Sequence, residues 1–227
     1  MATLAYRIRK RIERAALPLL LGPSSRPDMR RLGSHYGGYY IPLSLLSSES
    51  IYYSAGVGED ITFDLGLIDA TGCQVFALDP TPRSIEFVRR EAANQPRFHF
   101  QPLGLWHEEA TLRFYAPQDP RHVSHSILNL QGTDDYFEAA CKTLSSIMAE
   151  LGHDHLDLLK LNIEGAQYAV LDSIVENRVP VKVLAIAIDQ PTSPVKVFKT
   201  VRGLQRAGYS LVKVDGWTYT FVNESSP

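Results

Sequence analysis

A short apolar run ends in a glycine-containing turn in the first third of this chain. Residues 51–64 read I-Y-Y-S-A-G-V-G-E-D-I-T-F-D, which predicts a strand, a turn at Gly56 and Gly58, and a helix start. A second apolar run, 73–78, ends in Asp79, 21 residues after Gly58. Together these features form the nucleoside-binding half of a Rossmann-like sheet, in which missing side chains let a ligand touch the turn. We therefore predict a nucleotide-type cofactor site, with Asp79 placed to accept hydrogen bonds from ribose hydroxyls.

Two cofactors, NAD and S-adenosylmethionine (SAM), are bound by this arrangement. The dinucleotide fingerprint G-x-G-x-x-G fits the two glycines of the turn, but its third glycine falls on Ile61. Near the end of the chain, 209–214 and 217–222 alternate like strands and are joined by Asp215-Gly216, a strong hairpin signal. A terminal antiparallel hairpin on an otherwise parallel sheet is the methyltransferase variant of this fold. We therefore expect SAM as the cofactor.

Length and composition fit one α/β domain. With 227 residues and 44% hydrophobic content, the chain can fill one sizeable core. We expect its two cysteines, Cys73 and Cys141, to be buried reduced thiols rather than a disulfide. This cysteine usage indicates a cytoplasmic protein.

The N-terminal segment is basic. The first 31 residues hold eight Lys or Arg and two Asp or Glu, so the remainder carries a net charge of −8 and offers no basic face for nucleic acid. Apolar residues from Leu4 to Ala15 recur at helical spacing, which predicts an amphipathic basic helix. This helix is expected to dock on its own domain, on a second copy in a homo-oligomer, or peripherally on an anionic membrane surface. We divide the chain into this helix with its linker, 1–32, and a main domain, 33–227.

Helical and strand patterns alternate along the main domain. An insertion holds two strands, 110–115 and 136–141, around a polar loop, 116–135, whose length is typical of lids. The expected fold is a seven-stranded, mostly parallel sheet with a C-terminal antiparallel hairpin and helices on both faces. Between the first strand and the hairpin, predicted strands cover 73–78, 97–103, 156–163 and 181–188, and predicted helices cover 60–72, 82–93, 143–151, 166–175 and 195–207.

The run 160–167, K-L-N-I-E-G-A-Q, resembles the motif K-(I/L)-D-x-E-G-(A/S)-E of the FkbM-type methyltransferases. The turn segment 53–64 and the A-L-D-P-T-P run at 77–82 are similar to one branch of that family, which includes animal methyltransferase-like proteins. The resemblance extends from about residue 33 to residue 189. It implies a class I methyltransferase fold, SAM as cofactor, and methylation of a hydroxyl on a sugar or a secondary metabolite.

The sequence departs from this pattern at three positions. Ser54 stands before the turn where many class I methyltransferases carry an acidic residue, and its hydroxyl can still accept from the cofactor amino group. Asn162 replaces the usual aspartate and cannot act as a carboxylate base. Gln167 replaces a second acidic residue, at a position expected on the exposed start of a helix.

Three residues are candidates for catalysis: Glu164, His125 and Asn162. Methyl transfer needs an aligned nucleophile and a group that takes its proton, and open parallel sheets bind ligands at the carboxyl ends of their strands. Asn162 and Glu164 stand at the carboxyl end of one such strand and Asp189 at the carboxyl end of the next, although Glu164 can instead cap the helix after it. His125 lies in the predicted lid, and a histidine can take a proton near neutral pH. We predict that Glu164 or His125 is the base.

Cofactor contacts are expected from the first strand, its turn, the tip of the second strand and the segment after the third, where Trp106 can pack on adenine. The stretch 35–40, H-Y-G-G-Y-Y, is expected to fold over the cofactor. No metal is predicted, since His153 and His155 stand at the remote end of a strand. The predicted cofactor residues are Tyr53, Ser54, Gly56, Gly58, Asp60, Asp79, Pro80, Thr81, Gly104, Leu105 and Trp106.

The sequence thus predicts a SAM-dependent O-methyltransferase that acts on a small hydroxylated molecule, such as a sugar, glycoconjugate or secondary metabolite. Two alternatives stay open. One is an NAD-dependent Rossmann oxidoreductase. The other is a SAM-binding partner module without catalysis, which the loss of the carboxylate at Asn162 allows.

Overall fold

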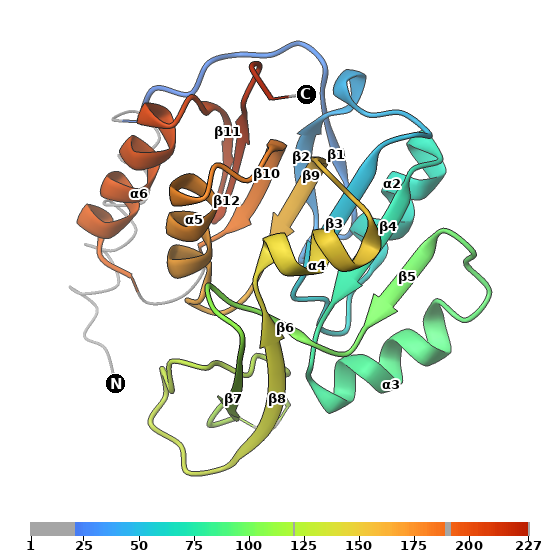
Figure 1. Ribbon diagram of the computed structural model, residues 1–227, viewed down its shortest axis with the longest axis vertical. Helices are drawn as coiled ribbons and strands as arrows, with labels where there is room; N and C mark the ends of the chain where they lie inside the picture. Colours follow the sequence, from blue (N-terminus) through green and yellow to red (C-terminus); the bar gives the residue numbers. More distant parts are fainter. Residues whose placement is uncertain (1–20, 120, 189–191, 227) are drawn as a thin grey trace.

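A central sheet of seven strands organises the chain in the computed structural model, which describes residues 21–119, 121–188 and 192–226 (Figure 1). The five central and outer strands β10, β9, β3, β4 and β5 are parallel, and β12 runs antiparallel to both of its neighbours. This arrangement confirms the predicted mostly parallel sheet with a terminal antiparallel hairpin. In sheet order the strands are β11 (Ser210–Asp215), β12 (Thr218–Val222), β10 (Val181–Ala187), β9 (Leu156–Leu161), β3 (Ile51–Ala55), β4 (Gln74–Leu78) and β5 (Phe98–Gln101).

The strand order reverses between β3 and β9. From β3 the chain builds outward through β4 to β5, and it then returns to place β9 and β10 on the other side of β3. At such a reversal the following connections diverge to opposite faces, which opens a crevice at the carboxyl ends of the two strands. The order of the sheet therefore fixes where a ligand can enter.

Helices cover both faces of the sheet, as predicted (Figure 1). One apolar cluster joins the sheet to α4, α5 and α6, and a second joins its other face to α2, α3 and the N-terminal strands. Buried strands of Val, Leu, Ile and Ala are what such a doubly covered parallel sheet requires. The helices are α2 (Thr62–Thr71), α3 (Pro82–Glu91), α4 (Leu144–Leu151), α5 (Gln167–Glu176), α6 (Pro194–Arg206) and the short 3-10 helix η1 (Leu43–Leu45).

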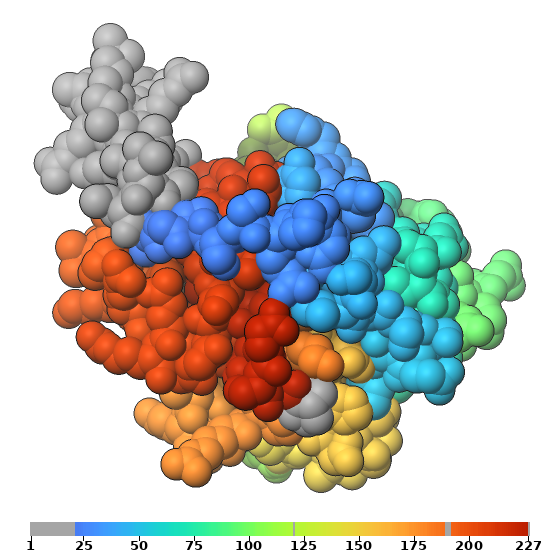
Figure 2. Space-filling model, turned by 90° about the horizontal axis from the view of Figure 1, so that it is seen from above, coloured from blue at the N-terminus to red at the C-terminus, as the bar shows by residue number. Residues whose placement is uncertain are grey.

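The predicted boundary at residue 33 is wrong, because it falls inside a hairpin. Strand β1 (Met29–Leu32) pairs with β2 (Tyr39–Pro42), and the Ser24 amide donates to the Leu211 carbonyl at 2.8 Å. Figure 2 shows this blue segment lying across the red C-terminal strands. Residues 21–32 thus belong to the main domain. The predicted basic amphipathic helix within 1–20 lies outside the described residues.

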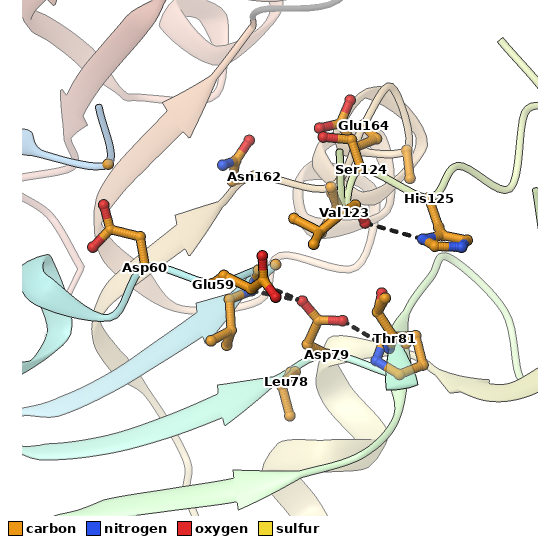
Figure 3. Close-up of a pocket in the computed structure, with 18 of the residues that line it drawn as sticks. Glu59, Asp60, Leu78, Asp79, Thr81, Val123, Ser124, His125, Asn162 and Glu164 are labelled. Atoms are coloured by element: carbon orange, nitrogen blue, oxygen red, sulfur yellow. Dashed lines mark hydrogen bonds between the residues drawn. The ribbon is translucent and has the colours of Figure 1, made fainter. Parts of the chain in front are cut away.

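The insertion forms a small sheet of its own. Strands β7 (Ala110–Tyr115) and β8 (Tyr136–Lys142) pair antiparallel, which confirms the two predicted strands, and the short β6 (Gly104–Leu105) adds to β8. The loop between β7 and β8 is held by backbone pairing of Tyr115 with Ser126. It lies over the carboxyl ends of the main strands (Figure 3).

Both cysteines are free and buried, as predicted. Burial raises the pKa of the Cys141 thiol to about 11 and also raises that of Cys73. These thiols are therefore protonated near neutral pH. Within residues 21–119, 121–188 and 192–226, no helix is long and apolar enough to cross a membrane.

His153 makes stability depend on pH. Its Nδ1 lies 2.8 Å from the Tyr53 hydroxyl, and burial, with the nearby His155 second, lowers the pKa of His153 below 6.5. The unfolded chain therefore takes up this proton first as the pH falls below about 6.5, so folding loses stability there. We expect the melting temperature to fall between pH 7.5 and pH 5.5, and to fall less for His153→Gln. Equal decreases in calorimetric scans of the two proteins would exclude this role.

Candidate functional site

A cavity of about 700 Å³ lies at the carboxyl ends of β3, β4 and β9 (Figure 3). This volume is within the range of about 300–1,000 Å³ typical of sites for small molecules and cofactors. Its walls come from the glycine turn, the tip of β4, the insertion loop, and the segment that leads into β2, with Tyr36, Gly37 and Tyr39. Part of the stretch 35–40, which is expected to fold over the cofactor, thus lies at the cavity wall.

The turn after β3 approaches its neighbours so closely that it excludes side chains. Gly56 has φ +84°, and a Cβ atom there would lie 1.8 Å from the Asn162 carbonyl oxygen. Gly58 has φ +59° but faces more open space. Both glycines line the cavity. The predicted reason for glycine at both positions is that a ligand can reach the backbone there. At Gly56 the close packing against Asn162 is a second reason.

Asp79 stands at the tip of β4 and ties this turn to its own strand. One carboxylate oxygen accepts from the Val57 and Gly58 amides, both at 2.9 Å, and the other accepts from the Thr81 amide at 2.8 Å (Figure 3). A carboxylate offers about four acceptor positions, so three amides leave capacity for a ligand hydroxyl. Asp79 is 6% exposed and lines the cavity. It therefore shapes the turn in addition to facing the cavity.

Most of the other predicted cofactor residues also line the cavity. Asp60 precedes α2 and accepts from the Thr62 amide at 2.9 Å, while Ile61 occupies the N-cap position. Burial would raise the pKa of Asp60, but hydrogen bonds from Ser34 and Thr62 hold that pKa below its usual value. Asp60 is thus an anion at the cavity wall. The remaining lining residues from the predicted set are Pro80, Thr81, Gly104 and Leu105.

Three predicted cofactor residues do not line the cavity. The Tyr53 hydroxyl points into the α4 side of the core toward His153, and the Ser54 hydroxyl accepts a hydrogen bond from Lys160 Nζ at 3.2 Å. Both side chains leave β3 before its end, so each is buried in one face of the sheet. Trp106 packs against His107, with ring centroids 4.4 Å apart, and lies outside the cavity lining. The structure therefore does not bring these three side chains to the cavity.

Glu164 lines the cavity in a strained backbone conformation. Its φ is +49°, and Gly165 follows at +92°. The Ser126 hydroxyl donates to the Glu164 carbonyl at 2.9 Å, which links the insertion loop to this turn. A left-handed residue with a Cβ atom costs about 1–3 kcal/mol and is found mainly at functional sites. The turn thus holds the Glu164 carboxylate at the cavity instead of in the cap position of α5, which Ala166 occupies.

His125 reaches the same cavity from the insertion loop (Figure 3). Its Nδ1 lies 3.0 Å from the Val123 carbonyl oxygen, which can only accept, so Nδ1 carries the hydrogen. In the neutral ring Nε2 is then the basic nitrogen. The ring also packs edge-on against Phe137, with centroids 5.2 Å apart. His125 is therefore oriented as a proton acceptor.

Asn162 lines the cavity with an unused acceptor. Its side-chain oxygen Oδ1 is buried and has no hydrogen-bond partner among the described residues. Buried acceptors are nearly always satisfied, so this atom fits a donor brought by a ligand. Asp189, the other candidate at this edge, lies outside the described residues.

Lys160 is a site residue that the sequence analysis missed. It is 3% exposed and lines the cavity floor from the interior of β9. The signal was a lysine within the apolar run L-L-K-L at 158–161. Gln167 was also misjudged: it is 1% exposed rather than on the surface, and its Oε1 accepts from the Gly165 amide at 2.7 Å. Among the described residues, no group of three or more His, Cys, Asp and Glu is placed to hold a metal.

Comparison with known proteins agrees with this geometry. The model of the Methyltransferase FkbM domain family matches residues 48–211, which include the glycine turn, Asp79 and the whole motif at 160–167. The chain belongs to the FkbM methyltransferase family. It therefore carries a SAM-dependent methyltransferase domain with the class I fold, and the sheet order and terminal hairpin are those expected of that fold.

Two curated relatives carry the same printed name, "Probable methyltransferase-like protein 24". The one from Rattus norvegicus is 24% identical over 155 residues, which covers 68% of this chain and 35% of that protein. The one from Homo sapiens is 26% identical over 124 residues, covering 54% of this chain and 27% of that protein. This chain thus spans about a third or less of the length of these relatives.

Solved structures with similar architecture include two archaeal fibrillarins. Methanococcus jannaschii fibrillarin has a TM-score of 0.46 and 13% identity, covering 87% of this chain and 84% of that one. Aeropyrum pernix fibrillarin, solved with bound S-adenosyl-L-methionine, has a TM-score of 0.46 and 11% identity, covering 88% and 85%.

We expect Asp79→Asn to weaken SAM binding at least about tenfold, because a charge-assisted hydrogen bond contributes about 1.5–3 kcal/mol. The same change also lowers stability, since three backbone amides lose their charged acceptor. Calorimetric titration with S-adenosylhomocysteine and its 2′,3′-dideoxyribose analogue separates the two effects. Wild type should prefer the hydroxylated ligand, and Asp79→Asn should lose that preference. If Asp79→Asn keeps the preference for the hydroxylated ligand, Asp79 does not contact the ribose hydroxyls.

Proposed function

We propose that this FkbM domain is a SAM-dependent O-methyltransferase that methylates a hydroxyl of a small molecule, such as a sugar, glycoconjugate or secondary metabolite. The observation that carries the proposal is the position of Glu164. Its carboxylate is held by a strained turn at the cavity that the glycine turn and Asp79 also line. A hydroxyl acceptor needs a nearby group to take its proton, and a carboxylate at the cavity wall can fill this role.

The residues present fit SAM. The side-chain-free turn at Gly56 and Gly58, the Asp79 carboxylate and the unused Asn162 oxygen offer contacts to a nucleoside and to donor groups. Gly104 and Leu105 line the wall beyond β4, where a base can pack. Bound there, SAM supplies an activated methyl group. The cavity of about 700 Å³ leaves room for a methyl acceptor of modest size.

The protein supplies alignment and a proton acceptor. Glu164 would accept the hydroxyl proton of the methyl acceptor as the new O–C bond forms. His125 would orient that hydroxyl from the insertion loop, because its basic Nε2 is fixed by the Val123 contact. Residues of the loop line the cavity, and the loop would limit the access of water during transfer.

A polar contact joins the middle of the insertion loop to Arg83 at the start of α3. Arg83 pairs with Glu59 at 2.8 Å and donates to the His122 carbonyl at 3.4 Å. The loop residues Val123, Ser124 and His125 line the cavity next to these contacts. We therefore expect this loop to select the methyl acceptor.

The test is a transfer assay with SAM labelled in its methyl group, run against a library of glycosides, glycoconjugates and polyketide alcohols. The proposal expects label on a hydroxyl oxygen of at least one class, and no transfer by Glu164→Gln above a few per cent of wild type. Transfer only to nitrogen, carbon or macromolecular acceptors would contradict it.

The two alternatives are not favoured. Membership of a methyltransferase family speaks against an NAD-dependent oxidoreductase. A partner module without catalysis has no use for an oriented histidine and a glutamate in a strained backbone conformation at one cavity. We retain the cytoplasm as the proposed location, in line with two free thiols.

A further inference from the structure

Lys160 places a buried ammonium group at the cavity floor. Its Nζ lies 3.2 Å from the Ser54 hydroxyl oxygen and 3.5 Å from the Gly56 carbonyl oxygen, directly beneath the glycine turn. The side chain is 4% exposed. Removal of a lysine charge from water carries a penalty of several kcal/mol, so a buried ammonium requires an anionic partner.

Within the described residues, the anionic partner of Lys160 is Asp64, which does not form a hydrogen bond with it. Asp64 is fully buried, and its Oδ2 lies 3.7 Å from Lys160 Nζ, beyond hydrogen-bond distance. Its other oxygen accepts from the Tyr52 hydroxyl, since burial and the adjacent Asp64 charge raise the pKa of Tyr52 and keep it protonated. No carboxylate of the described residues lies within hydrogen-bond distance of Lys160 Nζ. The ammonium therefore retains donor capacity toward the cavity that it lines.

The sheet order indicates which end of the cofactor reaches Lys160. Asp79, the ribose residue of the proposed site, is at the tip of β4, and Leu105 is on β6, which the chain reaches after β5, the next strand outward from β4. Lys160 is on β9, on the opposite side of β3, paired in register with Ser54. A cofactor with its ribose at Asp79 and its base beside Leu105 must direct its amino-acid end toward β9. That end carries the carboxylate of SAM.

Asp60 provides the opposite charge on the same part of the wall. It lines the cavity with Gly37 and Tyr39, and Figure 3 shows it on the side away from His125. Hydrogen bonds from Ser34 and Thr62 fix its carboxylate. A cation and an anion on one wall match a zwitterion, which is the form of an amino acid at neutral pH.

We propose that Lys160 and Asp60 form a subsite for the amino-acid end of SAM, in which Lys160 binds the carboxylate and Asp60 binds the ammonium. This inference rests on the proposed SAM site and adds the residues that hold its charged end. The proposal also explains why Ser54 stands where many class I methyltransferases carry an acidic residue. Asp60 supplies the negative charge for the cofactor ammonium, and the Ser54 hydroxyl orients Lys160 instead.

The test compares SAM with decarboxylated SAM, which lacks only the carboxylate, in calorimetric titrations. Wild type should bind SAM at least about tenfold more tightly than the decarboxylated form, the factor expected for a charge-assisted hydrogen bond. Lys160→Met should weaken the binding of SAM by about that factor and change the affinity for decarboxylated SAM by less than about threefold. Asp60→Asn should weaken both ligands by the same factor, because both keep the ammonium.

Equal affinity of wild type for the two ligands overturns the proposal, and so does an equal loss for both ligands in Lys160→Met. If Lys160→Met does not fold, the double variant Lys160→Met/Asp64→Asn removes both buried charges and permits the same comparison. Failure of wild type to bind either ligand would instead refute the SAM site itself. Methyl transfer with no discrimination between the two ligands would leave the proposed function in place and refute only the subsite.

Discussion

Gly56→Ala should abolish SAM binding and lower the melting temperature by about 6–12 °C. The added Cβ atom would lie 1.8 Å from the Asn162 carbonyl oxygen, a backbone atom that cannot rotate away, and φ at this position is +84°. Such an overlap should destabilise the fold by about 3 kcal/mol or more, and each kcal/mol corresponds to about 2–4 °C in a domain of this size. The turn must also move away from the position that receives the cofactor. Scanning calorimetry and titration with SAM measure the two effects.

Gly152→Ala is the matched control. Gly152 ends α4 with φ +75°, but a Cβ atom there meets nothing within 4 Å. Gly152→Ala should lower the free energy of unfolding by about 1 kcal/mol, and the affinity for SAM should not change. Should Gly56→Ala behave like this control, the close contact of the turn with the β9 end would have no role in binding.

Glu164→Gln should depress kcat by about 10²–10⁴ and change SAM affinity by less than about threefold. A positioned base contributes a factor of this size, and the amide keeps the shape of the side chain while losing its basicity. His125→Ala should then act mainly on the KM of the methyl acceptor. Glu91→Gln is a matched control, since Glu91 forms an exposed ion pair with Arg90 and does not line the cavity. Its kcat should remain within about threefold of wild type.

The opposite pattern would identify His125 as the base. In that case kcat would collapse in His125→Ala and survive in Glu164→Gln. We favour Glu164 because its turn follows a central strand, whereas His125 is carried by the insertion loop. Near-full kcat in both variants would contradict the catalytic assignment as a whole.

The sequence was most informative where local patterns decide structure. Apolar runs, helix caps and the Asp215-Gly216 turn predicted the seven strands and the hairpin, and the structure confirms them. The same patterns placed the glycine turn and Asp79 at one edge of the sheet. That succeeded because parallel strands of a βαβ unit always bring their carboxyl ends together.

The sequence analysis failed where side-chain direction or long-range pairing determines which residues reach the cavity and which strands form. Tyr53 and Ser54 are adjacent in sequence but face opposite sides of β3, so neither reaches the cavity beyond the strand end. Strand β1 was not predicted because its four residues are stabilised by pairing with β2 rather than by their own pattern. Lys160 was overlooked because its partners, Ser54 and Asp64, are about a hundred residues away in the chain.

Calorimetric titration of the FkbM domain with SAM, with NAD as the competing ligand, tests the central claim most directly. We predict one SAM bound per chain at the glycine turn, displacement by S-adenosylhomocysteine, no heat with NAD, and no SAM binding by Gly56→Ala. Binding of NAD in place of SAM, or SAM binding that Gly56→Ala leaves intact, would contradict this account of the site.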